Sequence, residues 1–477
     1  MNDVAPRRMP GAALLSLSLV AVVGVASSAT ASTASTSAMC ITVRNCNDSG
    51  SGSLRAAIAR AVSGDTIDMR GLTCSAISLS SGAIVIPQAN LRLLGPGYAK
   101  LSINGSGDRV LNHQGTGLLR LTNLSVANGA VSTPYAPEEN GESANGGCIY
   151  TAGSIELRGV HVHNCKATGG SQMAAGGGIF AVGAVSLIHS AVEYSKAIAA
   201  NVDNLGNYHG QAYGGGIYSG GQLTLDHVRL ANNVATTGPY ASRFAPSWGG
   251  GAYAKVLVAR SANIVANRSE SEGAGLFVDT FFDGRATITN STFAGNVAKQ
   301  GAGGIYSGPL ILRNSTLSSN TGGFWSGPNE ELEEGSAISS GQATISNSTI
   351  ASNHNTGGGV DPCGGAVHAS TLQLDSTIVA RNLCSDGAAL DVFSSSIAGS
   401  HDLIQAATSP LPAGTITADP QLSPLAYNGG PTPTRALAAT SPAIDAGSNP
   451  AGLQYDQRGP GFPRVKGAHT DIGAYEY

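Results

Sequence analysis

Gly214-Gly215-Gly216-Ile217-Tyr218 lies near the middle of the chain, and close copies of these five residues occur before and after it. Each copy consists of glycines followed by an aliphatic and then usually an aromatic residue. The copies are Gly146–Tyr150, Gly176–Phe180, Gly249–Tyr253, Gly273–Phe277 and Gly303–Tyr306, with weaker ones at Gly335–Ile338 and Gly364–His368. The aromatic positions recur about every 24 to 38 residues. A spacing this irregular predicts a coil whose loops vary in length while its strands stay in register.

We therefore predict an all-β fold, a right-handed parallel β-helix solenoid with a short N-terminal capping helix and an irregular C-terminal cap. Each coil would supply three short strands, each pairing with its equivalent one coil away at about 4.8 Å. Equivalent residues would then stack into ladders. The aromatic ladder would contain Tyr150, Phe180, Tyr218, Tyr253, Phe277 and Tyr306. A corner ladder of amide side chains would contain Asn267, Asn296, Asn320 and Asn353, where left-handed backbone angles are tolerated.

The two ends of the chain differ from the repeats. Ser53 can N-cap a short helix that carries Leu54, Ile58, Ala61 and Val62 on one face and ends at Gly64. First strands are expected at residues 66–68 and 84–86. We assign residues 40–75 to the N-terminal cap and first strands, residues 76–401 to the β-helix and residues 402–477, where the repeat is lost, to the C-terminal cap.

Residues 1–31 have the pattern of an export signal. Arg7 and Arg8 precede an apolar stretch from about Ala12 to Ala26, and Ala29-Thr30-Ala31 is a small-residue cleavage site. The apolar stretch is shorter than the roughly 20 residues that span a bilayer, and we expect no transmembrane segment in the mature chain. The expected location is outside the cell or at its surface, with the periplasm as an alternative.

Cysteine content and charge restrict the class of protein further. The seven cysteines suit an exported protein, and we predict the pairs Cys46–Cys74, Cys148–Cys165 and Cys363–Cys384, which leave Cys40 free. These pairs are the nearest available across coils or caps. The formal charge is -4 and only 12 % of residues are charged. Without a basic stripe, we expect no nucleic-acid partner.

Several stretches resemble known bacterial families. Gly52–Ile58 with Gly64–Ile67 looks like the N-terminal cap of bacterial β-helix proteins with the pectin-lyase-like fold. The C-terminal stretches resemble the choice-of-anchor Q domain, and they are Asn428–Thr434, Ser441–Gly447, Asp456–Gly459 and Asp471–Glu476. The middle repeats are similar to those of chlamydial polymorphic outer-membrane proteins, which are adhesin-like. The resemblance implies an exported, surface-associated or released β-helix.

No pattern in the sequence compels an enzyme. Glycan-cleaving enzymes need converging carboxylates, and the acids here are scattered. Asp375 is interpreted as a corner residue equivalent to Asn347. His161 and His163 with Cys148 and Cys165 suggest zinc, but alternation in a strand directs both histidines to water and leaves the cysteines to pair. We expect no catalytic residue, no metal and no cofactor.

Two acidic clusters leave alternatives open. Glu330, Glu331, Glu333 and Glu334 follow Trp325 and suggest either a solvated loop or a cation or sugar site. The C-terminal charged residues suggest either ion pairs that fix irregular turns or a bound divalent ion, and they are Asp445, Asp456, Arg458, Asp471 and Glu476.

Variation between coils is confined to loops, which are therefore the expected binding surfaces. The four longest span residues 134–145, 201–211, 239–248 and 324–334. The ligand-binding residues that we predict there are Tyr240, Phe244, Trp248, Phe324 and Trp325. The resulting hypothesis is a non-catalytic adhesion or carbohydrate-binding protein with glycans or cell-surface partners. The alternatives are a polysaccharide lyase or glycoside hydrolase acting on extracellular glycans, and a structural envelope component.

Overall fold

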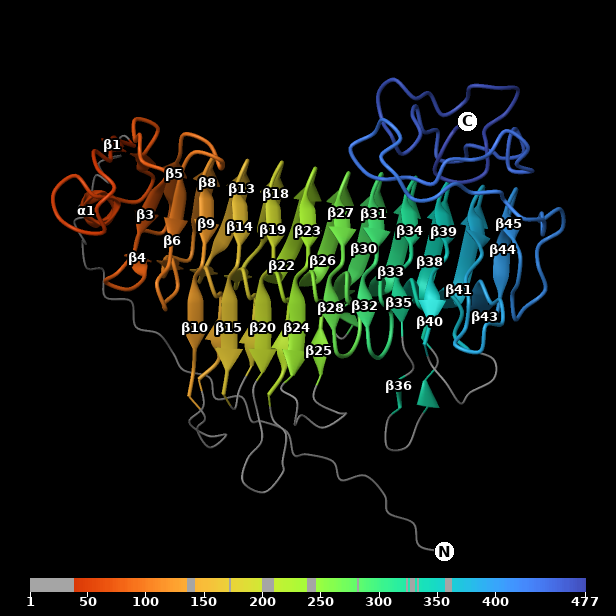
Figure 1. Ribbon diagram of the computed structural model, residues 1–477, viewed down its shortest axis with the longest axis horizontal. Coiled ribbons are helices and arrows are strands. Elements are labelled where there is room, and N and C mark those ends of the chain that lie inside the picture. Colours follow the sequence, from red (N-terminus) through yellow and green to blue (C-terminus); the bar gives the residue numbers. More distant parts are fainter. Residues whose placement is uncertain are drawn as a thin grey trace, which may run out of the picture. The chain divides into compact units, whose positions relative to one another are not determined.

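Parallel strands stacked coil upon coil make up most of the protein (Figure 1). The computed structural model describes residues 38–134, 142–170, 173–199, 210–237, 246–280, 283–322, 325–326, 331–332, 334–356 and 363–477. Within these residues one α-helix lies between the first two strands of a solenoid of parallel strands. The predicted all-β solenoid is thus confirmed.

The strands of the coils form four parallel sheets, A to D, within the described residues. Sheet A contains β1 (Cys40–Thr42), β2 (Thr66–Asp68), β4 (Ile84–Ile86), β5 (Leu91–Leu94), β7 (Leu111–His113), β8 (Leu118–Thr122), β12 (Ile149–Thr151), β13 (Ser154–Arg158), β17 (Ile179–Ala181), β18 (Val185–Ile188), β22 (Ile217–Asp226), β26 (Ala252–Arg260), β29 (Leu276–Val278), β30 (Arg285–Thr289), β33 (Ile305–Arg313), β38 (Ile338–Ser346), β41 (Val367–Asp375), β43 (Val392–Ser394) and β44 (Ile397–Ser400). Sheet B contains β3 (Ala76–Ser78), β6 (Ser102–Asn104), β9 (Ser125–Ala127), β14 (His161–His163), β19 (Ala191–Glu193), β23 (Arg229–Ala231), β27 (Asn263–Val265), β31 (Thr292–Ala294), β34 (Thr316–Ser318), β39 (Thr349–Ala351), β42 (Ile378–Ala380) and β45 (Leu403–Ile404).

The two smaller parallel sheets complete the coils. Sheet C contains β10 (Ala130–Ser132), β15 (Lys166–Gly169), β20 (Lys196–Ala199), β24 (Val234–Thr237), β28 (Arg268–Ser269), β32 (Val297–Ala298), β35 (Thr321–Gly322) and β40 (His354–Asn355). Sheet D contains β11 (Ala144–Asn145), β16 (Ala174–Ala175), β21 (Ala212–Tyr213) and β25 (Ser247–Trp248). One antiparallel pair, β36 (Trp325–Ser326) with β37 (Glu331–Leu332), lies outside them.

Alternation along each strand separates the core from the surface. In sheet B the middle residue points inward, as Val192, Leu230 and Ile264 do, and each of these is 0 % exposed. The residues on either side of it point outward, because successive side chains of a strand face opposite ways. The outer positions are therefore free to carry polar groups, while the inner ones must stay apolar.

The N-terminal helix α1 (Leu54–Arg60) begins as predicted. The Ser53 hydroxyl accepts a hydrogen bond from the Ala56 amide, which caps the helix. Leu54 and Ile58 are buried, but Val62 is 49 % exposed. Val62 is exposed because the helix ends at Arg60, two residues before it, so the apolar face of the helix does not include Val62.

A continuous ladder of buried side-chain amides fixes one corner of the coils. Asn320 illustrates its geometry: its amide N–H and its Nδ2 both donate to Oδ1 of Asn353, at 2.9 and 3.0 Å. The same pair of bonds links the successive members Asn233, Asn267, Asn296, Asn320, Asn353 and Asn382, and finally Asp391. The predicted amide ladder is confirmed and is longer than predicted, ending in a carboxylate that accepts the last pair of bonds.

The backbone angles at this corner differ from the expectation. The left-handed residues are not the ladder asparagines but those just before them, such as Ser319 (φ 58°) and Ser352 (φ 60°). The ladder side chains must point inward to bond one another, so the residue with left-handed backbone angles lies one position before each ladder asparagine. At the preceding corner, between sheets A and B, Ser376 and not Asp375 occupies the place of Asn347, because Asp375 pairs with Ser346.

The aromatic ladder on the outer face of sheet A is confirmed. Its rings stack with centroids 4.7 to 5.5 Å apart and interplanar angles of at most 9°. The members are Tyr150, Phe180, Tyr218, Tyr253, Phe277 and Tyr306. Such stacks stabilise the register of neighbouring coils beyond the burial of apolar area.

Three disulfides staple the coils, and they join the cysteines paired from the sequence: Cys46–Cys74, Cys148–Cys165 and Cys363–Cys384. Cys40 is free and exposed. Disulfides persist in oxidising compartments, so they are consistent with an exported protein.

The C-terminal residues, predicted to cap the solenoid, return along its side. Figure 1 shows this segment at the ends of the strands from β27 onward. The hydroxyl of Thr292 donates to the Pro433 carbonyl at 2.6 Å, and the hydroxyl of Thr349 accepts from the Ala474 amide at 3.0 Å. Both threonines are outward-facing residues of sheet B, so this segment covers the later half of that sheet.

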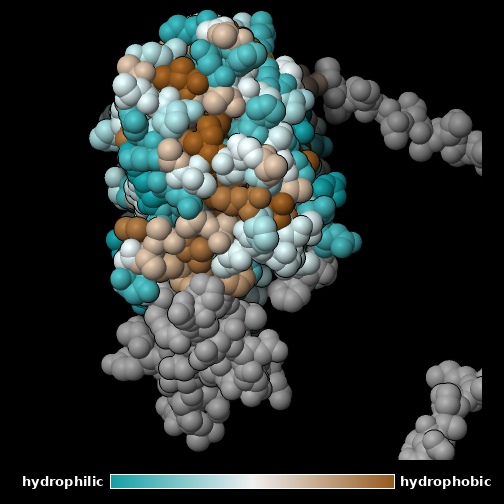
Figure 2. All heavy atoms as spheres, turned by 90° about the vertical axis from the view of Figure 1, so that its right-hand side faces the viewer, coloured by the Kyte–Doolittle hydropathy of each residue, from teal (hydrophilic) through white to brown (hydrophobic). Residues whose placement is uncertain are grey.

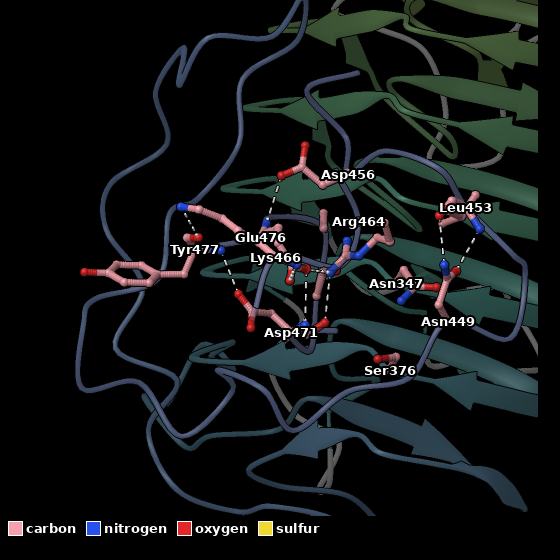
Figure 3. A network of polar contacts seen from close by, with 12 residues as sticks. Asn347, Ser376, Asn449, Leu453, Asp456, Arg464, Lys466, Asp471, Glu476 and Tyr477 are labelled. Carbon is pink, nitrogen blue, oxygen red and sulfur yellow. Dashed lines mark hydrogen bonds and ion pairs between the residues drawn. The ribbon is translucent and has the colours of Figure 1, made fainter. Parts of the chain in front are cut away.

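Buried charges hold the returning segment in shape (Figure 3). Arg464 is 1 % exposed, pairs with Glu476 at 3.1 Å and donates to the carbonyl of Asp471 at 2.8 Å. Arg458 pairs with Asp456. The ion-pair interpretation of the C-terminal charged residues therefore describes Asp456, Arg458 and Glu476. The carboxylates of Asp445 and Asp471 instead accept hydrogen bonds from backbone amides, those of His469 and of Asp445 and Tyr477 respectively.

The C-terminal end of the coil shows hydrophobic residues down the middle of its surface, between hydrophilic ones (Figure 2). Partly buried Ile397, Ala407 and Leu411 pack there against the core. The end of the apolar interior is thus only partly covered within the described residues.

Replacing Asn320 by Ala should destabilise the solenoid strongly. The change removes the acceptor of both the backbone N–H and Nδ2 of Asn296, and it removes the two hydrogen bonds that Asn320 Nδ2 donates to the Phe293 carbonyl and to Asn353 Oδ1. Each unsatisfied buried group costs about 1–3 kcal/mol. The melting temperature of the oxidised protein measures the effect. Gln342→Ala, at an exposed position of β38, is the control, and equal melting of the two variants would contradict a stabilising role for the ladder.

Candidate functional site

A cleft of about 490 Å³ lies on the outer face of sheet B, next to the part of this face that the returning C-terminal segment covers. Its floor consists of β14, β19, β23 and β27 and the turns that precede them. One wall is the loop that carries Tyr98, and the opposite wall is the stretch that contains Tyr427 and Pro431. The cleft is therefore built from residues 98 to 431, which the coiling brings together.

Three side chains on the floor form one hydrogen-bonded group. His161 Nε2 lies 2.9 Å from Oε2 of Glu193, and Arg229 Nε donates to Oε1 of the same carboxylate at 2.7 Å. The hydrogen bond from His161, followed by those from Arg229, lowers the pKa of Glu193. Glu193 is therefore ionised at neutral pH, and it holds both partners in place.

Aromatic rings surround this charged group. Tyr98 meets His161 edge-on at 6.5 Å between ring centroids, and its side chain is 56 % exposed. Tyr427, on the opposite wall, is 64 % exposed although its hydroxyl accepts from Nδ2 of Asn263 at 3.1 Å. Two exposed tyrosines on opposite walls of one polar floor form a site suited to a ring-shaped, hydroxyl-rich ligand.

The imidazole rings of four histidines lie in or next to the cleft. The rings of His161 and His163 lie 4.5 Å apart and those of His189 and His227 lie 4.8 Å apart. His227 also contacts the Asp226 carboxylate at 2.7 Å. Burial, and then the neighbouring His161, lower the pKa of His163. As expected from alternation, His161 and His163 face outward while Cys148 and Cys165 pair with each other.

The lining of the cleft contains one carboxylate and one guanidinium group. Among its lining residues Glu193 is the single carboxylate, and it is already ionised and occupied by His161 and Arg229. Cleavage with an acid and a base carboxylate needs two such groups about 5 to 10 Å apart. Among the described residues no group of three or more His, Cys, Asp or Glu side chains is placed to hold a metal.

The five predicted ligand-binding aromatics are not brought together by the described structure. Tyr240, Phe244 and Phe324 lie outside the described residues, and Trp325 belongs to β36, of whose side chains nothing is described. Trp248, in β25, stacks on Phe277 at 4.8 Å, so its ring packs against the next coil. Ligand binding by these residues stays a prediction.

A second feature is a set of buried acids beside the aromatic ladder. Asp279 is 2 % exposed and bonds the Tyr253 hydroxyl. Burial, and then the charge of Glu334, raise the pKa of Glu272 to about 8, and burial raises that of Glu334 to about 7. Glu334, predicted to belong to a solvated loop or a cation or sugar site, is 7 % exposed. A solvated position is therefore wrong for this residue, which lies against Asn355 at the edge of sheet C.

Most of the cleft could not be recognised from the sequence. His161 was noticed, but Tyr98, Glu193, Arg229 and Tyr427 were not, because they are separated by up to 329 residues along the chain. The available signal was the register of the repeats. Aligning the strand that contains His161 with the next two places Arg229 in the same outer row as His161, and places Glu193 opposite His163.

Comparison with known proteins gives a likeness of fold. The crystal structure of pectate lyase Pel9A aligns with 92 % of this chain and 96 % of its own, with a TM-score of 0.39 and 13 % sequence identity. No protein-family model and no curated protein sequence matches the chain. The one described helix is too short and polar to cross a membrane.

Glu272 and Glu334 should make the protein less stable as the pH rises. Glu272 keeps its proton in the folded state up to about pH 8, whereas the unfolded chain loses it near the ordinary value of 4.5. Between these values the folded state binds more protons, so unfolding becomes easier with rising pH. Glu272→Gln should flatten the fall of the melting temperature between about pH 5 and 8. The exposed Glu142→Gln is the control, and an unchanged slope in Glu272→Gln would contradict the assignment.

Proposed function

We propose that this protein is exported and binds extracellular carbohydrate in the cleft on sheet B, without cleaving it. The observation that carries the proposal is the pairing of two exposed tyrosines, Tyr98 and Tyr427, across a floor of hydrogen-bonding side chains. Sugar rings present an apolar face that stacks on aromatic rings, and hydroxyl groups that bond polar ones. Arg229 and His161 provide such polar groups at the floor.

The rigidity of the cleft supports binding as its role. Arg229, His161 and Asn263 lie on strands held on both sides by neighbouring coils, so their backbones need little ordering when a ligand arrives. A site that is ordered in advance avoids part of the entropy cost of association. An extended surface of this kind suits an adhesin-like protein at the cell surface.

Export is supported by the three disulfides and by the signal-like residues 1–31. The C-terminal resemblance to the choice-of-anchor Q domain supports a surface location and membership of that group of β-helix proteins. Polysaccharide cleavage and a purely structural envelope role are the alternatives, and each predicts a different result in the experiment that follows.

Tyr98→Ala and Tyr427→Ala should each weaken glycan binding about three- to tenfold, because each loses one stacking surface. The full oxidised protein is first screened on a glycan array, and affinities for the glycans retained are then measured by calorimetry. Tyr477→Ala removes an equally accessible tyrosine, 47 % exposed and outside the cleft, and should bind as the unmodified protein does.

The same samples are assayed for reducing ends and for unsaturated products. Release of either product would overturn the non-catalytic part of the proposal. Binding to no glycan would favour the structural role. Binding that is lost in Trp248→Ala but not in the cleft variants would move the site to the loop aromatics.

A further inference from the structure

A row of basic side chains runs along sheet C next to the cleft. Lys166 of β15 and Lys196 of β20 are register partners, and the row continues through Val234 to Arg268 of β28. All three basic residues are exposed. Neighbouring strands are about 4.8 Å apart, so the row places positive charges about 5 and 14 Å along the coil axis from Lys166.

The acids around this row are already engaged. Glu193 bonds His161 and Arg229, and Glu270 pairs with Lys299. Asp226 contacts His227, on the far side of sheet B from the row. No carboxylate among the described residues pairs with Lys166, Lys196 or Arg268. These charges therefore remain available to an external anion although the whole chain is formally acidic.

An exposed aromatic ring joins the row to the cleft. Tyr194 lies at the turn between sheets B and C, with a left-handed φ of 52°, and is 55 % exposed. It follows Glu193 of the cleft and precedes Lys196 of the row by two residues. The left-handed turn directs the chain from one sheet to the next and leaves the ring at the corner. Tyr194 thus lies between Glu193 of the cleft and Lys196 of the basic row, at the turn that joins sheets B and C.

We propose that the ligand is an anionic polysaccharide, which lies across sheets B and C with its sugar rings on the tyrosines and its carboxylate or sulfate groups on Lys166, Lys196 and Arg268. This inference rests on the proposed carbohydrate binding and names its substrate class. A neutral glycan would leave the row unused. A small anionic sugar would not span it, because Lys166 and Arg268 are three coils apart, about 14 Å.

Binding is measured by calorimetry with the full oxidised protein and four polymers: polygalacturonate for carboxylate groups, heparin for sulfate groups, dextran as a neutral polymer, and single-stranded DNA as a non-carbohydrate polyanion. The variant Lys166→Gln/Lys196→Gln removes two charges without adding any. Arg285→Gln/Arg313→Gln removes two exposed charges from sheet A instead, and is the matched control. Melting curves check that both variants fold.

We expect one or both acidic polysaccharides to bind more tightly than dextran, and the lysine variant to lose about tenfold in affinity while the arginine variant is unchanged. Binding should also weaken as NaCl is raised, because exposed charges are screened. Which of the two acidic polymers binds better identifies the anionic group. Either preference supports the inference.

Dextran binding that equals acidic-polymer binding and is unaffected by the lysine variant would overturn this inference and leave carbohydrate binding intact. DNA binding as tight as that of the acidic polysaccharides would overturn recognition of a sugar. Failure of all four polymers, together with an empty glycan array, would overturn the proposed function as well.

Discussion

The stacking of equivalent residues from successive coils is the constraint on which the rest of the structure depends. Each buried corner asparagine donates twice to the next, so a slip of one residue would leave two buried donors unsatisfied at every coil that it crossed. The cost grows with the number of coils, whereas a longer loop costs little, since closure entropy rises only with the logarithm of its length. The ladder therefore fixes the register and tolerates repeats of very different length.

Because the register is fixed, equivalent outer positions of a sheet form continuous rows across the coils. In one such row the type of residue changes along its length. In sheet B the row reads His161, Ala191, Arg229 and Asn263, and then Thr292 and Thr316 where the C-terminal segment covers it. Threonine suits the covered part because its short hydroxyl bonds the segment that packs on it. The larger polar side chains of His161, Arg229 and Asn263 occur where the row is open. The boundary between the two parts forms one wall of the cleft.

The solenoid, its two ladders and its cysteine pairing could be predicted because they repeat. Glycine turns and aromatic residues recur often enough to reveal the coil, and the amide ladder followed from four copies of one pattern. The failures were at places that occur once. Val62 lies beyond a helix end, Asp375 was misaligned by one residue, and the C-terminal segment gave no sign that it would turn back along sheet B.

The candidate site could not be predicted for a related reason. Loops were favoured as binding surfaces because they vary, yet the cleft lies mainly on strands, at outer positions that the core does not restrict. Glu193 and Arg229 have no unusual neighbours in the sequence. They form part of a site only because their strands lie on adjacent coils. In a solenoid with fixed register, a functional row is therefore found by comparing the residues that occupy the same outer position in successive coils. On sheet C that reading brings Lys166 next to Lys196, and Lys196 follows Tyr194 at the turn that leads from the cleft on sheet B.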